Sequence, residues 1–184
     1  MSKANAAVEK ALPSDFFELF GLPRTFALDS QKLEQCYRDI QGKVHPDRFM
    51  DADAAQKRRS LQWSSQVNDA YRTLKNPLQR AVHLLNLAGL EMSSTGTRLS
   101  TPLDFLSDQM EWRESLMVAR QTRDLPATQT LETRLEDALA TRYAALETAL
   151  NAETWEIAQI EVNCLMFLEK LRQEISDTLE SLEG

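Results

Sequence analysis

Cysteine, glycine and proline are scarce in this sequence, which contains 2, 5 and 6 of them respectively. The two cysteines, Cys36 and Cys164, match neither a CxxC metal pair nor the framework of a disulfide-rich secreted protein. No apolar run approaches the roughly 20 residues of a transmembrane helix, and the first residues lack the apolar core of a signal peptide. We therefore expect a cytoplasmic protein that does not enter a membrane.

Helix-favouring residues are abundant instead, and the content of Glu, Leu, Ala, Gln and Arg predicts an all-α fold with almost no strand. The net charge of -7 is unevenly distributed. Residues 1–100 carry 14 Lys and Arg against 11 Asp and Glu, a net of +3, whereas residues 101–184 carry 7 against 17, a net of -10. The asymmetry predicts two modules, and the acidic second half argues against nucleic acid as its partner, because phosphate binding needs clustered Lys and Arg.

Apolar periodicity predicts a short apolar turn and three helices in the first module. The turn covers residues 16–22, and the first helix runs over residues 29–44 with Asp29 as its N-cap. This helix ends there because the residue before a proline is pushed out of helical geometry. Further helices are expected over residues 54–75 and 77–89.

The second module begins after residues 91–101, whose Ser, Thr and Gly content is that of a linker. Three long amphipathic helices, over about 102–123, 127–150 and from 153 onward, predict an antiparallel three-helix bundle over residues 102–184. The apolar stripe expected on the last helix consists of Ile157, Ile160, Cys164, Leu168, Leu171, Ile175, Leu179 and Leu182.

The tripeptide His45-Pro46-Asp47 connects the first two long helices of the first module. Pro46 fixes its own φ and restricts His45, so this loop loses little entropy when it docks on a partner. Asp47 presents a carboxylate that can accept a bidentate pair from an arginine of the partner. His45 can bind the partner or cap the loop, and the sequence leaves both open. The plainer alternative is a helix stop followed by a turn.

Cations surround this tripeptide. Lys32 and Lys43 are eleven residues apart and lie on the same edge of a helix, so together with Arg38 they can steer an acidic surface of a partner toward the loop. The alternative is a solvated helix face, since Glu34 and Asp39 dilute the positive field.

Enzymatic interpretations of the same segment are weaker. A nucleophile and base formed by Cys36 and His45 is conceivable, but Cys36 lies on the apolar stripe of its helix, where packing is its expected role. The second histidine of the sequence, His83, lies inside an apolar helix, which disfavours a metal site. The sequence also lacks a Gly-rich phosphate loop.

A short apolar helix followed by two long helices joined through His-Pro-Asp resembles the J-domain. The tyrosine and basic residue that precede the tripeptide in that family are here Tyr37 and Arg38. The resemblance implies a J-domain over residues 15–90. The polar segment before it, residues 1–14, is expected to be a flexible N-terminus. The resemblance also implies docking on a heat-shock protein 70 class chaperone and stimulation of its ATPase. The residues implied in chaperone binding are His45, Pro46, Asp47, Lys32, Arg38, Lys43 and Arg48.

Two apolar stripes run along residues 101–117. One contains Leu103, Leu106, Met110 and Met117, and the other contains Phe105, Trp112 and Leu116. A three-helix bundle needs only one stripe for its core, and Phe and Trp are the better core fillers. We therefore expect Leu106 and Met110 to face outward beside Glu111 and Glu114, as a partner site. The alternative is one wide buried face.

The order of motifs along the chain is similar to that of the HscB family, J-domain co-chaperones of iron-sulfur cluster assembly. The matching strings are FFELFGLP, HPDRF, VNDAYRTLKNPLQRA, FLSDQMEWRE and FLEKL. The resemblance implies that the protein brings the cluster scaffold protein IscU to the dedicated chaperone HscA, without a catalytic residue, metal site or cofactor of its own. It places a scaffold-binding patch on the first and third bundle helices, at Leu106, Met110, Glu111, Glu114 and Phe167.

The sequence departs from the family pattern at three positions. Ser107 stands where an apolar residue is frequent, Val118 replaces an acidic residue, and His83 replaces an aromatic one. Ser107 is expected to weaken or shift the contact with the scaffold. The N-terminal metal-binding cysteine pair of eukaryotic relatives is absent, which favours the bacterial branch.

Two alternative functions remain open at this stage. A J-domain adaptor for a different client would keep the chemistry of the His-Pro-Asp loop without binding the cluster scaffold. A purely structural helical protein would leave the ATPase rate of any chaperone unchanged. The apolar stripes of the bundle can also bury a dimer face.

Overall fold

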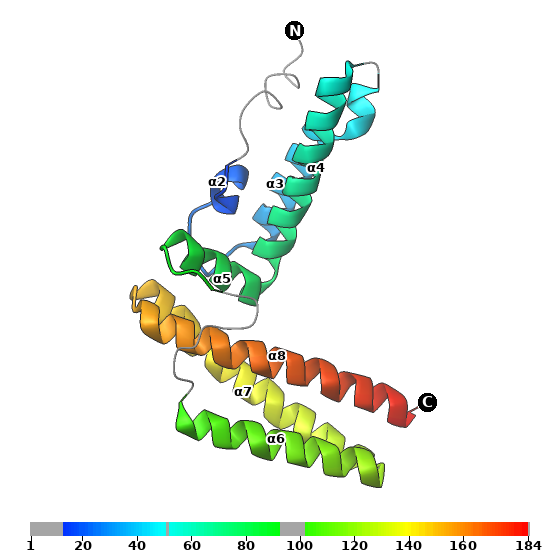
Figure 1. Cartoon of the computed structure of the whole chain (residues 1–184), viewed down its shortest axis with the longest axis vertical. Helices are drawn as coiled ribbons and strands as arrows, with labels where there is room; N and C mark the ends of the chain where they lie inside the picture. Colours follow the sequence, from blue (N-terminus) through cyan, green and yellow to red (C-terminus); the bar gives the residue numbers. More distant parts are fainter. Residues whose placement is uncertain (1–12, 51, 93–101, 184) are drawn as a thin grey trace. The chain divides into compact units, whose positions relative to one another are not determined.

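The computed structural model describes residues 13–50, 52–92 and 102–183 (Figure 1). All regular structure within these ranges is helical, which confirms the predicted all-α fold. The chain divides into two compact units, Met1–Ala88 and Gly89–Gly184. Most of the predicted N-terminal segment 1–14 and of the predicted linker 91–101 lies outside the described residues. None of the helices in the described ranges is both long enough and apolar enough to cross a membrane.

The described part of the first unit folds into α2 (Phe16–Phe20), α3 (Ser30–Val44), the 3-10 helix η1 (Pro46–Phe49), α4 (Ala54–Lys75) and α5 (Pro77–Leu87). The side chain of Asp29 caps α3 by accepting hydrogen bonds from the backbone N–H groups of Gln31 and Lys32. Gly21 ends α2 with a φ of 63°, a backbone conformation that favours glycine. The predicted bounds of α3 and α4 are confirmed to within one residue.

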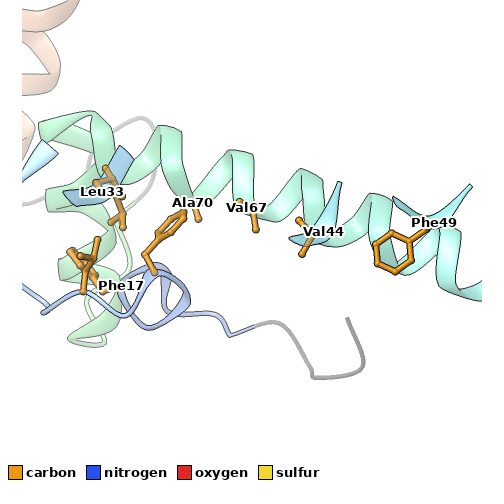
Figure 2. Close-up of a cluster of buried hydrophobic side chains, with 9 residues drawn as sticks. Phe17, Leu33, Val44, Phe49, Val67 and Ala70 are labelled. Atoms are coloured by element: carbon orange, nitrogen blue, oxygen red, sulfur yellow. The ribbon is translucent and has the colours of Figure 1, made fainter. Parts of the chain in front are cut away.

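The core of the first unit lies where α2, α3 and α4 meet (Figure 2). Its members include Phe17, Leu33, Val44, Phe49, Val67 and Ala70, each at most 4% exposed. Burial of one large apolar side chain contributes about 1.5–3 kcal/mol to the free energy of unfolding. Because Val44 and Phe49 stand on either side of the His-Pro-Asp tripeptide, this core reaches as far as the loop.

His83 on α5 holds the start of α2 in place. Its Nε2 accepts a hydrogen bond of 3.1 Å from the backbone N–H of Phe16, and its ring stacks on that of Phe16 with centroids 4.4 Å apart. Burial lowers the pKa of His83, opposed by the nearby carboxylate of Asp15. A neutral imidazole suits this position, because a protonated Nε2 cannot accept the hydrogen bond. Thus the histidine keeps the stacking of an aromatic ring and adds a cap.

The described part of the second unit contains α6 (Leu103–Thr122), α7 (Leu125–Asn151) and α8 (Trp155–Glu183). α7 runs in the opposite direction to α6 and α8, as predicted for an antiparallel bundle (Figure 1). The chain turns from α6 to α7 at Arg123, whose φ is 53°, and Asp124 caps α7 through the N–H of Ala127. The core includes Phe105, Leu116, Leu135, Leu146, Leu165 and Leu168.

One residue of the apolar stripe predicted on the last helix, Ile157, faces solvent instead of the core. Ile157 is 51% exposed, whereas Ala158 and Val162 are fully buried. Successive residues of an α-helix are rotated by about 100°, so a helix that packs through Ala158 and Val162 turns Ile157 outward. The prediction of Ile157 as a core residue is therefore wrong. Cys164, Leu168, Leu171 and Ile175 of the same stripe are buried as predicted.

Candidate functional site

The His-Pro-Asp loop begins where α3 ends. His45 has φ -57° and ψ 131°, outside the helical region, as its position before a proline predicts. Its backbone N–H still donates to the carbonyl of Gln41 at 3.0 Å, and its own carbonyl accepts from the N–H of Arg48 at 3.0 Å. The chain therefore passes from α3 into η1 through one non-helical residue, and Pro46 starts η1.

Two buried side chains and one buried hydroxyl fix the loop to the core. Val44 is 1% exposed and Phe49 is 4% exposed. Between them, the Oγ of Ser60 on α4 donates a hydrogen bond of 2.8 Å to the backbone carbonyl of Val44. Ser60 is itself fully buried. These contacts hold the loop from both ends, so the positions of His45 and Asp47 are set before any partner arrives.

His45 and Asp47 project into solvent from this fixed base. The side chain of His45 is 50% exposed and that of Asp47 is 79% exposed. The Nδ1 of His45 accepts a long hydrogen bond of 3.4 Å from the backbone N–H of Asp47, and the same nitrogen lies 3.4 Å from the Asp47 Oδ2. The sequence left two roles open for His45, binding a partner or capping the loop. In the structure its side chain caps η1, and half of the side chain remains exposed to solvent.

The cations near the loop differ in how they are held. Arg38 forms an ion pair with Glu34, which lowers the pKa of that carboxyl group, so the dilution expected from Glu34 is real. Arg48 turns back and donates from Nη1 to the carbonyl of Gly42 at 2.6 Å, near the C-terminus of α3. Lys32 and Lys43 are exposed.

The first turns of α4 add three exposed cations that the sequence argument did not single out, Lys57, Arg58 and Arg59. They lie eight to ten residues after the end of η1 along the chain, and α4 packs against η1. These cations could have been predicted from the sequence, because three adjacent basic residues stand near the start of a helix that contacts the loop. The positive field around Asp47 is therefore shared between α3 and α4.

The surroundings of the loop support neither a nucleophile and base formed by Cys36 and His45 nor a metal site. Cys36 is half-buried and packs against the core of the first unit, as its position on the apolar stripe predicts. Within the described ranges, His, Cys, Asp and Glu side chains form no group of three or more that could hold a metal ion.

On α6, the two apolar stripes face different surroundings. Phe105 and Leu116 are each 3% exposed, whereas Leu106 is 42% exposed and Met110 is 74% exposed. The predicted orientation of both stripes is therefore correct for these four residues, and the alternative of one wide buried face is wrong. Trp112, expected in the core, is only half-buried. The side chain of Leu103 lies outside the part of the chain that the structure describes.

Phe167 on α8 joins the two helices at this surface. Its half-buried ring meets the ring of Phe105 edge to face, with centroids 5.8 Å apart. The guanidinium of Arg113 on α6 lies over the ring of Phe167, 5.5 Å from its centroid. The family resemblance implied that Phe167 belongs to a patch shared by the first and third bundle helices, and α6 and α8 do contact each other. The contact with Arg113 was missed.

The acidic edge of α6 is partly committed to the neighbouring helix. Glu111 forms a 3.0 Å ion pair with Arg134 of α7, whose guanidinium also lies over the ring of Trp112 at 5.1 Å. Glu114 is exposed. Both members of the Glu111–Arg134 pair are more than half exposed, so the pair contributes little to stability, and Glu111 can exchange its partner at low cost.

Comparisons with known proteins address the whole chain. A family model described as the HSCB C-terminal oligomerisation domain matches residues 101–176. The chain is 43% identical over 175 residues to the co-chaperone protein HscB homolog of Azoarcus sp. (strain BH72), a match that covers 94% of this chain and 98% of that protein.

Two solved structures share the architecture. The chaperone HscB from Vibrio cholerae is 35% identical with a TM-score of 0.82, and the match covers 91% of this chain and 99% of that one. Human co-chaperone protein HscB is 28% identical with a TM-score of 0.85, over 95% and 86% of the two chains. The chain therefore belongs to the HscB family of J-domain co-chaperones, and its role is that of a co-chaperone and not of an enzyme.

Proposed function

We propose that this protein stimulates the ATPase of the heat-shock protein 70 class chaperone HscA and delivers the iron-sulfur cluster scaffold protein IscU to it, in the cytoplasm. The maturation of iron-sulfur proteins is the process that this delivery supports. The observation that carries the proposal is the carboxylate of Asp47, 79% exposed on a loop whose flanking residues Val44 and Phe49 are buried. An exposed acid on a fixed support is suited to docking on a partner.

Chaperone docking relies on the residues of α3 and η1. The carboxylate of Asp47 accepts a bidentate pair from an arginine of the chaperone, a strong and directional contact. His45 and Pro46 keep the backbone of the loop in its docking conformation. Lys32, Arg38, Lys43 and Arg48 attract an acidic surface of the chaperone over a distance of about one Debye length, about 8 Å at physiological salt.

Scaffold binding uses the exposed stripe of the second unit. Leu106 and Met110 supply apolar area that water leaves on binding, and Phe167 supplies part of an aromatic ring. Glu111 and Glu114 flank this area and favour a partner with a basic rim. Ser107, in place of a frequent apolar residue, is exposed on the same helix and reduces the apolar area available.

Joining both sites in one chain makes delivery efficient. We assign residues 15–90 to the J-domain, residues 91–101 to a linker and residues 102–184 to the scaffold-binding bundle. A scaffold held by the bundle is then present near the chaperone at an effective concentration set by the linker, so modest affinity at each site is sufficient. Delivery in this sense requires no cofactor bound to the co-chaperone.

The chaperone arm is tested with steady-state ATP turnover of HscA at increasing co-chaperone concentration. Asp47→Asn keeps the shape of the side chain and removes its charge, so we expect stimulation to disappear while the circular dichroism spectrum stays unchanged. Asp39→Asn is the matched control, because Asp39 is an exposed acid on α3 and its loss only strengthens the positive field. Stimulation by Asp47→Asn equal to that of the wild type would refute the chaperone arm and favour the purely structural alternative.

The scaffold arm is tested by calorimetric titration of purified IscU. Leu106→Ala combined with Met110→Ala is expected to weaken binding by about tenfold or more, as for central apolar contacts of an interface. The matched control is Leu61→Ala combined with Met50→Ala, which removes two exposed apolar side chains of the same types from the first unit. Undiminished binding by the first double variant contradicts the patch. A wild type that stimulates HscA without binding IscU points to a different client.

A further inference from the structure

Positive charge gathers between α6 and α8, although the second unit is strongly acidic. Residues 101–184 contain 7 Lys and Arg against 17 Asp and Glu. Three of those seven, Arg113, Arg120 and Lys170, line one groove of about 430 Å³, and Arg123 lines the next groove along the same helices.

The groove combines these cations with an apolar floor. Leu116 is buried at its base, and Met117 beside it is 53% exposed. Gln121 and Glu174 complete the lining, so the side chains carry three positive charges against one negative charge. A segment that brings both a carboxylate and an apolar side chain therefore matches the surface, whereas a basic segment is repelled.

Two of the cations are held in position before any ligand binds. Arg120 donates from Nε to the Oγ1 of Thr178 at 2.7 Å and from Nη2 to the carbonyl of Glu174 at 2.8 Å. Arg113 rests over the ring of Phe167. Side chains that are already ordered lose little entropy when they bind a carboxylate, so these cations favour an acidic ligand more than free surface lysines do.

The groove is continuous with the exposed stripe of α6. Met110, Arg113, Met117 and Arg120 follow one another at spacings of three or four residues, which places them along a single edge of the helix. On α8, Phe167, Lys170 and Glu174 follow the same spacing, and α8 runs in the same direction as α6 (Figure 1). A partner that covers Leu106 and Met110 and extends along the two helices therefore enters the groove.

We propose that the groove between α6 and α8 binds an acidic segment of the same partner protein that covers Leu106 and Met110. This inference rests on the proposed function. It adds an acidic segment to the basic rim already proposed for the partner. The partner has an apolar centre, a basic rim opposite Glu114 and a carboxylate-bearing segment opposite Arg113, Arg120 and Lys170. A partner surface with a basic part and an acidic part can lie along the helices in one direction only, because the reversed orientation brings like charges together.

The test is the affinity of purified IscU for full-length variants. Lys170→Glu reverses one exposed charge of the groove without touching the core. Lys57→Glu makes the same change at an exposed lysine of the first unit. We expect Lys170→Glu to weaken binding about tenfold and to reduce its salt dependence, with Lys57→Glu and Lys170→Arg both within about twofold of the wild type.

The outcomes separate this inference from the proposed function. Equal affinities for the Lys170→Glu and Lys57→Glu variants, with the Leu106 and Met110 double variant still impaired, refute the acidic segment and leave the apolar patch intact. Tighter binding by Lys170→Glu also refutes it, because a basic segment must then occupy the groove. A wild type that fails to bind IscU refutes the groove and the scaffold arm together, whereas the chaperone arm is judged separately by Asp47→Asn.

Discussion

Ser60→Ala tests whether the His-Pro-Asp loop is positioned by the core. The substitution removes the 2.8 Å hydrogen bond from the buried Ser60 hydroxyl to the carbonyl of Val44, one residue before His45. A buried carbonyl that loses its partner costs about 1–3 kcal/mol of folding free energy. Replacing Ser by Ala within a helix returns about 0.5 kcal/mol. The net expected loss is about 0.5–2.5 kcal/mol, and the middle of this range corresponds to roughly tenfold in an opening equilibrium.

Amide hydrogen exchange on the full-length protein measures this loss for each unit separately. The control is Ser65→Ala, at an exposed position of the same helix, where the gain in helix propensity is the same and no core contact is removed. We expect amides of α3 and α4 to exchange about tenfold faster in Ser60→Ala than in Ser65→Ala, with the second unit unchanged. Equal protection in the two variants refutes the anchoring of the loop through Ser60.

Two further predictions concern buried polar groups. Since burial lowers the pKa of His83 from 6.5, despite the nearby Asp15 and with Arg24 adding to the shift, the unfolded chain takes up the proton first as the pH falls. The free energy of unfolding of the first unit therefore decreases below about pH 6.5 until the folded pKa is passed, and urea denaturation of His83→Phe should lack this decrease. In the second unit, Arg142 pairs with the buried Glu161 at 3.1 Å. Arg142→Met should cost about 1–3 kcal/mol in thermal unfolding, because the buried carboxylate of Glu161 loses its partner. Glu161→Gln in that background should recover part of this loss, and no recovery would contradict the ion pair as its cause.

Helix boundaries in this chain were predictable because their signals are local. Asp29 caps the helix that follows it within three residues, and the proline after His45 ends that helix regardless of what packs around it. The two stripes of α6 were also legible, since the apolar periodicity lies in one segment. Which stripe faces inward followed from size, because Phe105 fills a core better than Leu106.

Contacts between distant segments were not predictable from a single sequence. Ser60 and Val44 are 16 residues apart, and His83 and Phe16 are 67 residues apart. Nothing in the composition around Ser60 distinguishes it from an exposed serine on the same helix. The error at Ile157 has the same origin, because the orientation of the first turn of α8 depends on the helices it meets and not on its own apolar spacing.

In both proposed sites, a buried residue close by in the sequence holds an exposed functional residue in position. Phe49 is buried two residues after the exposed Asp47, and Phe105 is buried one residue before the exposed Leu106. A partner therefore meets side chains whose backbone is already placed, and binding costs little ordering entropy. It follows that loss of the exposed residue should reduce partner binding at constant stability, whereas loss of the buried residue should reduce both. A change at Asp47 or Leu106 that lowered stability as much as binding would contradict this division of roles.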